Sequence, residues 1–105
     1  MTEGFGSVWV ANGGDDTVSR LDARTGRPIG RPIRVGDQPS KLTVAAGLVW
    51  VTNFGSATVT RIDPRTGRVV GAPLRVGRHP VGVAFGAGHV WVASLGDGTV
   101  TKIRP

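Results

Sequence analysis

Short apolar runs separated by polar turns recur along the chain at a fixed interval. The tripeptide Val-Trp-Val is centred on Trp9, Trp50 and Trp91, so its copies are 41 residues apart. Each copy precedes a turn rich in small and polar residues, and then a run in which polar and apolar residues alternate. Such alternation predicts a half-buried β-strand, whereas a run that is apolar on both sides predicts a strand covered on both faces. The pattern therefore predicts three copies of one β-rich unit.

The middle copy shows the expected strands most completely. We call its strands A, B, C and D in chain order, and strand B is the one that carries the Trp. Strand D contains Gly71 and Pro73, which suits the edge of a sheet. The four expected strands span residues 42–45, 48–52, 58–63 and 68–76.

A repeat of this length with four short strands is typical of a β-propeller blade. The first copy aligns from Met1, whereas the third reaches Ile103 and then has Arg104-Pro105 where the turn to strand D would begin. We expect an all-β fold of four-stranded antiparallel blades, forming a partial propeller of about three blades whose last outer strand is missing. We interpret the chain as a propeller fragment and assign residues 1–36 to blade 1, 37–77 to blade 2 and 78–105 to blade 3.

The middle copy also resembles a known family. The run Val49-Trp50-Val51-Thr52-Asn53, followed by residues 58–64 and by Thr66-Gly67, resembles the YVTN-type bacterial β-propeller repeat, which is related to the streptogramin lyase-like propellers. The resemblance covers the whole chain and implies the fold, but not one activity, because such proteins share blades rather than a chemistry. Streptogramin lyases would imply a catalytic His, an acid and magnesium. His79 and His89 are expected on opposite faces and do not rebuild that arrangement.

Composition narrows the functional classes. The chain has no cysteine, which excludes disulfides and thiolate metal sites, and it has no apolar run of about 18 residues and no signal peptide. We expect a soluble protein without a membrane contact or targeting signal, in an undetermined compartment. The net charge of +6 comes mostly from arginines in the turn before strand D and in strand D. Nucleic acid is a disfavoured partner, because no exposed aromatics interleave with these arginines and charge also protects sheet edges.

Three blades leave two sheet faces without a neighbour. At about 25 cal/mol per Å² of apolar area, even a few hundred Å² on each face corresponds to roughly ten kcal/mol, comparable with the stability of a small domain. We therefore expect the chain to assemble with itself into a ring. A homodimer with six blades is favoured, because propellers have about four to eight, and a larger oligomer is the next possibility. The expected blade-packing interface residues are Val8, Trp9, Val10, Val90, Trp91, Val92, Val100 and Ile103.

The loops from strand B to C and from strand D to the next strand A are expected to share one face, where propellers generally bind ligands. Acids and amides there could bind a hard cation, but the same residue types also form tight turns. We assign them to turns and expect no catalytic, cofactor-binding or metal-ligating residue and no cofactor. The residues of this possible ligand face are Asn12, Asp15, Asp16, Asn53, His79 and Asp97.

These observations favour a non-enzymatic propeller fragment that acts as a structural or interaction module and self-assembles into a closed ring. The alternative is part of a metal-dependent lyase- or hydrolase-like propeller, whose active site lies in absent blades or forms across the channel of the oligomer. A rise in melting temperature with calcium or magnesium would favour the alternative. The sequence does not identify a ligand.

Overall fold

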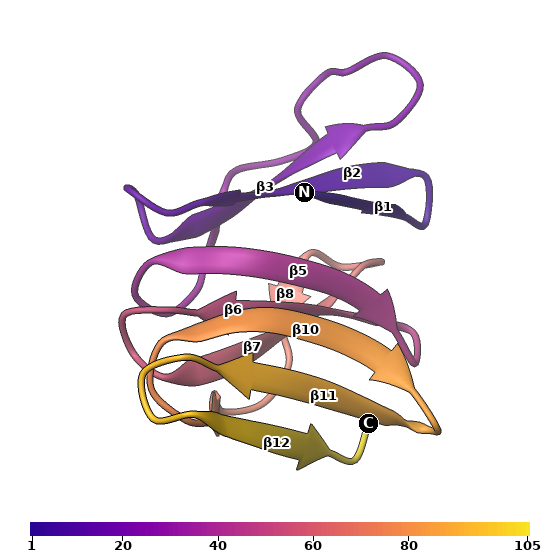
Figure 1. Cartoon of the computed structure of the whole chain (residues 1–105). Helices are drawn as coiled ribbons and strands as arrows, with labels where there is room; N and C mark the ends of the chain where they lie inside the picture. The colour runs from indigo at the N-terminus through magenta and orange to yellow at the C-terminus, as the bar shows by residue number, and fades with distance from the viewer.

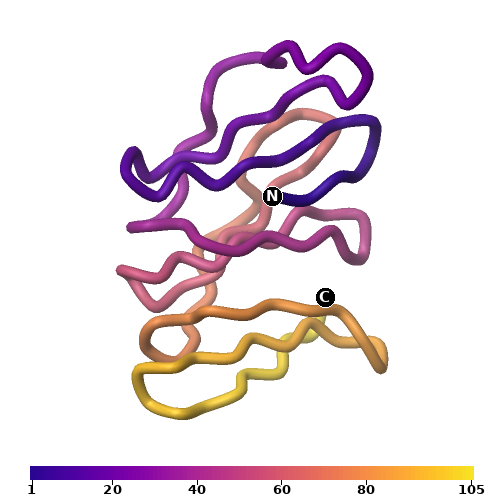
Figure 2. The backbone as a smooth tube through the Cα atoms, turned by 45° about the horizontal axis from the view of Figure 1, so that its top comes forward, coloured from indigo at the N-terminus to yellow at the C-terminus, as the bar shows by residue number.

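The computed structural model describes residues 1–105 and contains twelve β-strands in three antiparallel sheets, stacked one on the next (Figure 1). Each sheet is made from one copy of the repeat, so the predicted all-β partial propeller is confirmed. Figure 2 shows the N-terminus in the first layer and the C-terminus in the third, with the outer segment of blade 2 (salmon) behind blade 1 in this turned view. No helix in the structure has the length and apolar character needed to cross a membrane.

The strands follow one order in every blade. Blade 1 contains β1 (Thr2–Gly4), β2 (Ser7–Asn12), β3 (Thr17–Asp22) and β4 (Ile33–Arg34). Blade 2 contains β5 (Pro39–Ala45), β6 (Leu48–Asn53), β7 (Thr58–Asp63), β8 (Arg68–Val69) and β9 (Leu74–Arg75). Blade 3 contains β10 (Pro80–Gly86), β11 (His89–Ser94) and β12 (Thr99–Ile103).

Strand D of blade 2 differs from the single strand expected over 68–76. It is split into β8 and β9, which both pair with β7. The N–H of Val70 still donates to the backbone oxygen of Arg61, and residues 71–73 leave the ladder. Gly71 there has a φ of 67°, and Pro73 has no N–H to donate. Blade 1 makes the same interruption between a bridge at Pro28 and β4. Blade 3 has three strands and no strand D within residues 1–105, as predicted.

Strand A is longer than the apolar pattern indicated. In blades 2 and 3 it begins at Pro39 and Pro80, and a bulge follows each proline. The turn from A to B then uses two consecutive residues with positive φ, as at Ala46-Gly47. This geometry matches the right-handed twist of the strands that it joins.

Alternation along strand B gives each blade two different faces. We call the side with the Trp of strand B the Trp face, and the side with its two Val residues the Val face. Trp9 is buried in one cluster with Val49 and Val51, and Trp50 is buried in a second cluster with Val90 and Val92. The Trp face of each blade therefore packs on the Val face of the next.

A glycine after strand D permits close approach at each of these two junctions. A Cβ built on Gly36 would lie 2.8 Å from Cγ of Asn53, a fully buried side chain in the next blade. A Cβ on Gly77 would meet Thr99, Asp97 and Ser94 in the same way. Blade junctions in this chain thus require a residue without a side chain at this point.

The substitution Gly36→Ala is expected to lower the free energy of unfolding by about 1–3 kcal/mol, because the added methyl group overpacks a buried junction. Urea denaturation followed by tryptophan fluorescence measures the change. Gly14→Ala is the matched control, since nothing lies within 4 Å of a Cβ built on Gly14. Equal stability of the two variants would contradict the close approach.

Candidate functional site

The outer side of blade 1 is its Val face. It carries Val8 and Val10 of β2 together with Leu21, which pairs with Val8 across the sheet. All three are half-buried, whereas Val49, Val51 and Ile62, the residues at the same repeat positions in blade 2, are 0 % exposed. Blade 1 therefore has a partly exposed apolar face, whereas the equivalent face of blade 2 is buried.

The outer side of blade 3 is its Trp face. Trp91 is half-buried there, and Val100 is 68 % exposed, although Val59 at the same repeat position is 0 % exposed. The ammonium group of Lys102 lies 5.7 Å from the ring centroid of Trp91. The Arg20 guanidinium lies over Trp9 in the same way, at 5.2 Å. The outer Trp face thus has the composition of the buried ones.

The structure divides the predicted interface residues into two groups. Val8, Val10, Trp91 and Val100 lie on the two outer faces. The others pack between blades inside the chain, because neighbouring residues of a strand point to opposite sides. This internal group consists of Trp9, Val90, Val92 and Ile103.

Two residues of the outer faces were not identified from the sequence. Leu21 and Lys102 lie on strand C, and their position follows from the cross-strand pairs of Val8 with Leu21 and Trp91 with Lys102. For Lys102 the repeat already showed a conserved type of residue, because Arg20 and Arg61 occupy the same repeat position in blades 1 and 2. The pairing register was needed to assign this position to a face.

The predicted ligand face is built largely from hydrogen bonds that hold loops together. Nδ2 of Asn53 donates to Oγ1 of Thr58 at 3.1 Å and to Oγ1 of Thr60 at 2.9 Å. Asn12 makes the same pair of bonds in blade 1. Both amides thereby join the end of strand B to strand C.

Asp97 anchors the connection between blades 2 and 3. Its carboxylate accepts a hydrogen bond from Oγ1 of Thr99 at 2.8 Å and one from the backbone N–H of Arg78 at 3.2 Å. These bonds, the Thr99 bond first, lower the pKa of Asp97 below its ordinary value. In blade 2, Ser56 accepts the corresponding bond from the N–H of Asp37. The Ser56 hydroxyl in blade 2 therefore has the same structural role as the Asp97 carboxylate in blade 3.

The remaining loop residues contact other loops of the chain or are exposed. Asp16 accepts a hydrogen bond from the N–H of Gln38 at 2.9 Å. The ring of His79 stacks on Phe54, with centroids 4.5 Å apart and planes 10° from parallel. Asp15 is exposed. The structure brings no three His, Asp or Glu side chains into a group that could hold a metal ion.

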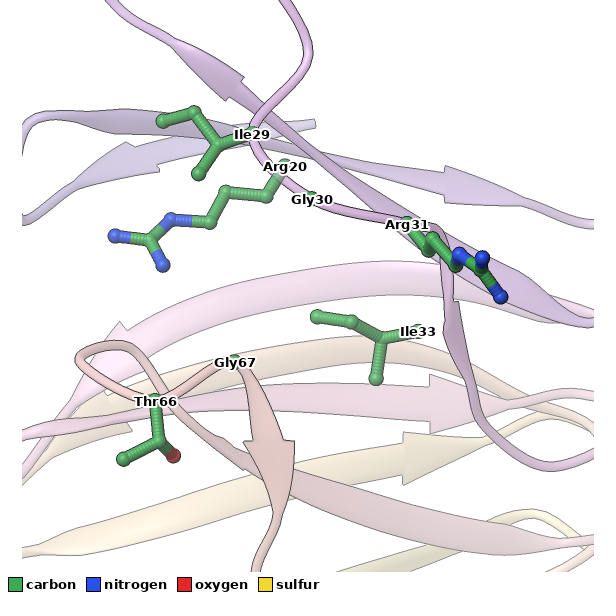
Figure 3. A pocket seen from close by; sticks show the side chains of 7 residues that line it. All are labelled: Arg20, Ile29, Gly30, Arg31, Ile33, Thr66 and Gly67. Atoms are coloured by element: carbon green, nitrogen blue, oxygen red, sulfur yellow. The ribbon is translucent and has the colours of Figure 1, made fainter.

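A cleft of about 190 Å³ lies between the outer part of blade 1 and the turn after β7 in blade 2 (Figure 3). Two arginines line it, but Figure 3 shows the side chains of Arg20 and Arg31 extending in opposite directions. Arg20 also donates from Nε to Oγ of Ser7 at 2.9 Å. The two cations do not converge on one point where an anion would sit.

A comparison with protein-family models finds no match, and a comparison with curated proteins finds none. Solved structures with the same fold include hydrazine synthase of Kuenenia stuttgartiensis, with a TM-score of 0.80 at 24 % identity over 87 % of this chain and 26 % of that one. The computationally designed Ika4 protein has a TM-score of 0.77 at 17 % identity, over 98 % of this chain and 62 % of its own. Virginiamycin B lyase from Staphylococcus aureus has a TM-score of 0.69 at 16 % identity, over 99 % of this chain and 39 % of its own.

At these identities the comparisons establish the fold and not an activity. They include a streptogramin lyase-like propeller and a designed protein. No family model matches this chain, so membership of the YVTN family is not confirmed. The chain spans between about a quarter and three-fifths of the length of these structures. The chain is thus similar to part of each of them.

Proposed function

We propose that this chain is a non-enzymatic structural module that assembles with copies of itself, head to tail, into a closed propeller ring. The observation that carries the proposal is the identity of the outer faces. One is a Val face and the other a Trp face, and these are the two surfaces that pack together at both junctions inside the chain. The Trp face of blade 3 can therefore receive the Val face of blade 1 from a second copy.

The contacts of the closing junction follow from the internal ones. Trp50 packs against Val90 and Val92 within the chain. By the same register, Trp91 of one copy packs against Val8 and Val10 of the other. Val100 and Leu21 then become covered, as Val59 and Ile62 are in blade 2. The driving force is the removal of apolar surface from water.

Residues 1–105 supply fewer side chains to the closing junction than to the internal ones. Leu74 and Val76, in and just after strand D of blade 2, pack against the cluster that joins blades 2 and 3. Blade 3 has no strand D within residues 1–105, so these residues supply no counterpart of that pair. We expect assembly to be reversible and dependent on protein concentration.

Two copies satisfy the geometry of closure best. They supply six blades, which lies within the range of about four to eight blades found in propellers, whereas three copies would supply nine. A two-fold axis then relates two identical head-to-tail junctions, and no outer face is left free. An open chain of copies would leave two faces uncovered at its ends.

Light scattering coupled to size-exclusion chromatography is expected to give twice the chain mass of 10.9 kDa at high protein concentration, with dissociation on dilution. The physical reason is that dilution removes the mass-action gain of burying two outer faces. A monodisperse monomer at every concentration would contradict the proposed assembly. A continuous series of larger species would contradict closure.

A further inference from the structure

Two residues depart from the repeat pattern at positions that the ring would bring together. Glu3 occupies the column of Val44 and Phe85, and His89 occupies the column of Ser7 and Leu48. Glu3 pairs with Val8 across blade 1 and therefore lies on its outer Val face. His89 pairs with Gly86 across blade 3, on the side of the sheet that carries Trp91. Both departures are thus on outer faces.

The junction between blades 1 and 2 shows which positions meet. A Cβ built on Gly4 would lie 2.8 Å from Cγ2 of Val44, so the columns of these two residues touch across a junction. Gly86 shares the column of Gly4, and Glu3 shares that of Val44. At Gly86 nothing lies within 4 Å of the same point. In a closed ring, this free position receives Glu3 of the second copy.

The surroundings of Gly86 are cationic. His89 is its cross-strand partner, and Lys102 is exposed on the same face, beside Trp91. Arg104 directly follows the pair of Val90 with Ile103 and stands in a column where blades 1 and 2 have Asp22 and Asp63. We call the cations Lys102 and Arg104, together with the neighbouring His89 ring, the cationic corner of blade 3. At the opposing end of blade 1, the Glu3 carboxylate lies beside Val8, and Asp22 and Arg24 lie at and just after the end of strand C.

We propose that Glu3 of one copy binds the cationic corner of a second copy and so selects the blade faces that close the ring. This inference rests on the proposed function. The same position is apolar at both internal junctions, where Val44 and Phe85 occupy it. Only the closing junction therefore places an acidic residue, Glu3, opposite cationic groups. Complementary charges of this kind favour the correct pairing and disfavour others more than they add affinity.

A charge-swap cycle tests the contact. The variants are E3K, H89E and the double variant, and the dimer dissociation constant of each is measured by sedimentation equilibrium at low and high salt. We expect each single substitution to raise the constant about tenfold at low salt, because each places like charges at the junction. The double substitution places an opposite-charge pair at positions 3 and 89 and should return the constant close to that of the unmodified chain. High salt should reduce all of these differences, because the charges lie at a solvent-accessible rim.

The outcomes separate the two proposals. If the unmodified chain dimerises and neither single substitution weakens the dimer, the Glu3 contact is wrong while the ring proposal stands. If both single substitutions weaken the dimer but the double variant is no better than either, direct pairing with His89 is wrong. If the unmodified chain does not dimerise, both proposals fail. Near-ultraviolet circular dichroism verifies that each variant is folded, since both positions lie at or near the surface.

Discussion

Replacing Trp50 with alanine is expected to lower the free energy of unfolding by about 3–5 kcal/mol. Trp50 is 0 % exposed and packs against Val90 and Val92 at the junction between blades 2 and 3. Its Nε1 also donates to the backbone oxygen of Ala45 at 2.9 Å. The loss combines a cavity, a broken junction and an unpaired carbonyl. It is a large fraction of the stability of a chain of this size.

Urea denaturation at several protein concentrations measures this change. Because Trp50 lies inside one chain, the loss should persist when dilution has separated any dimer. Trp50→Phe is the matched control, since it keeps an aromatic ring in the junction and removes mainly the hydrogen bond to Ala45. Its expected cost is about 1–3 kcal/mol. If W50A lost less free energy of unfolding than W50F, the packing described for this junction would be wrong.

The repeat made much of the fold predictable from sequence. Three copies of Val-Trp-Val in one register indicate three equivalent strands, and apolar residues on both sides of Val49-Trp50-Val51 require a sheet on either face. Strand B and strand C of blade 2 were located to within one residue of β6 and β7. Local pattern was sufficient there because β6 and β7 pair with each other without a register shift.

Other features depend on pairing between strands and could not be obtained from local pattern. Residues 71–73 leave the ladder although they lie within an apolar run. Trp9 belongs to an internal junction and Trp91 to an outer face, although their local sequences are nearly the same. The difference comes from where each blade stands in the stack, which is a property of the whole chain.

In the candidate site, too, some features follow from the local sequence and others depend on contacts between blades. Asp97 lies in the turn after strand B, whereas Asn53, which was expected in the corresponding loop, is the last residue of β6. Turn chemistry suggested a structural role for both residues. The bond that Asp97 accepts from Thr99 is local, whereas the bond from the Arg78 N–H joins Asp97 to the segment that connects two blades. Contacts of that kind join residues distant in sequence. Such contacts depend on how the blades stack and could not be predicted from the local sequence.

Trp91→Ala is expected to raise the dimer dissociation constant at least about thirtyfold, because aromatic residues at the centre of an interface commonly contribute 2 kcal/mol or more. Trp91 has the repeat position of Trp50 but is half-buried, since no blade of the same chain covers it. The substitution should therefore act mainly on assembly, whereas W50A acts on folding. Val69→Ala is the control, because Val69 is a 40 % exposed residue on the outer edge of blade 2. Sedimentation velocity across a dilution series distinguishes the variants. If W91A dimerises as well as V69A, Trp91 lies outside the closing junction, and the ring must close through another surface.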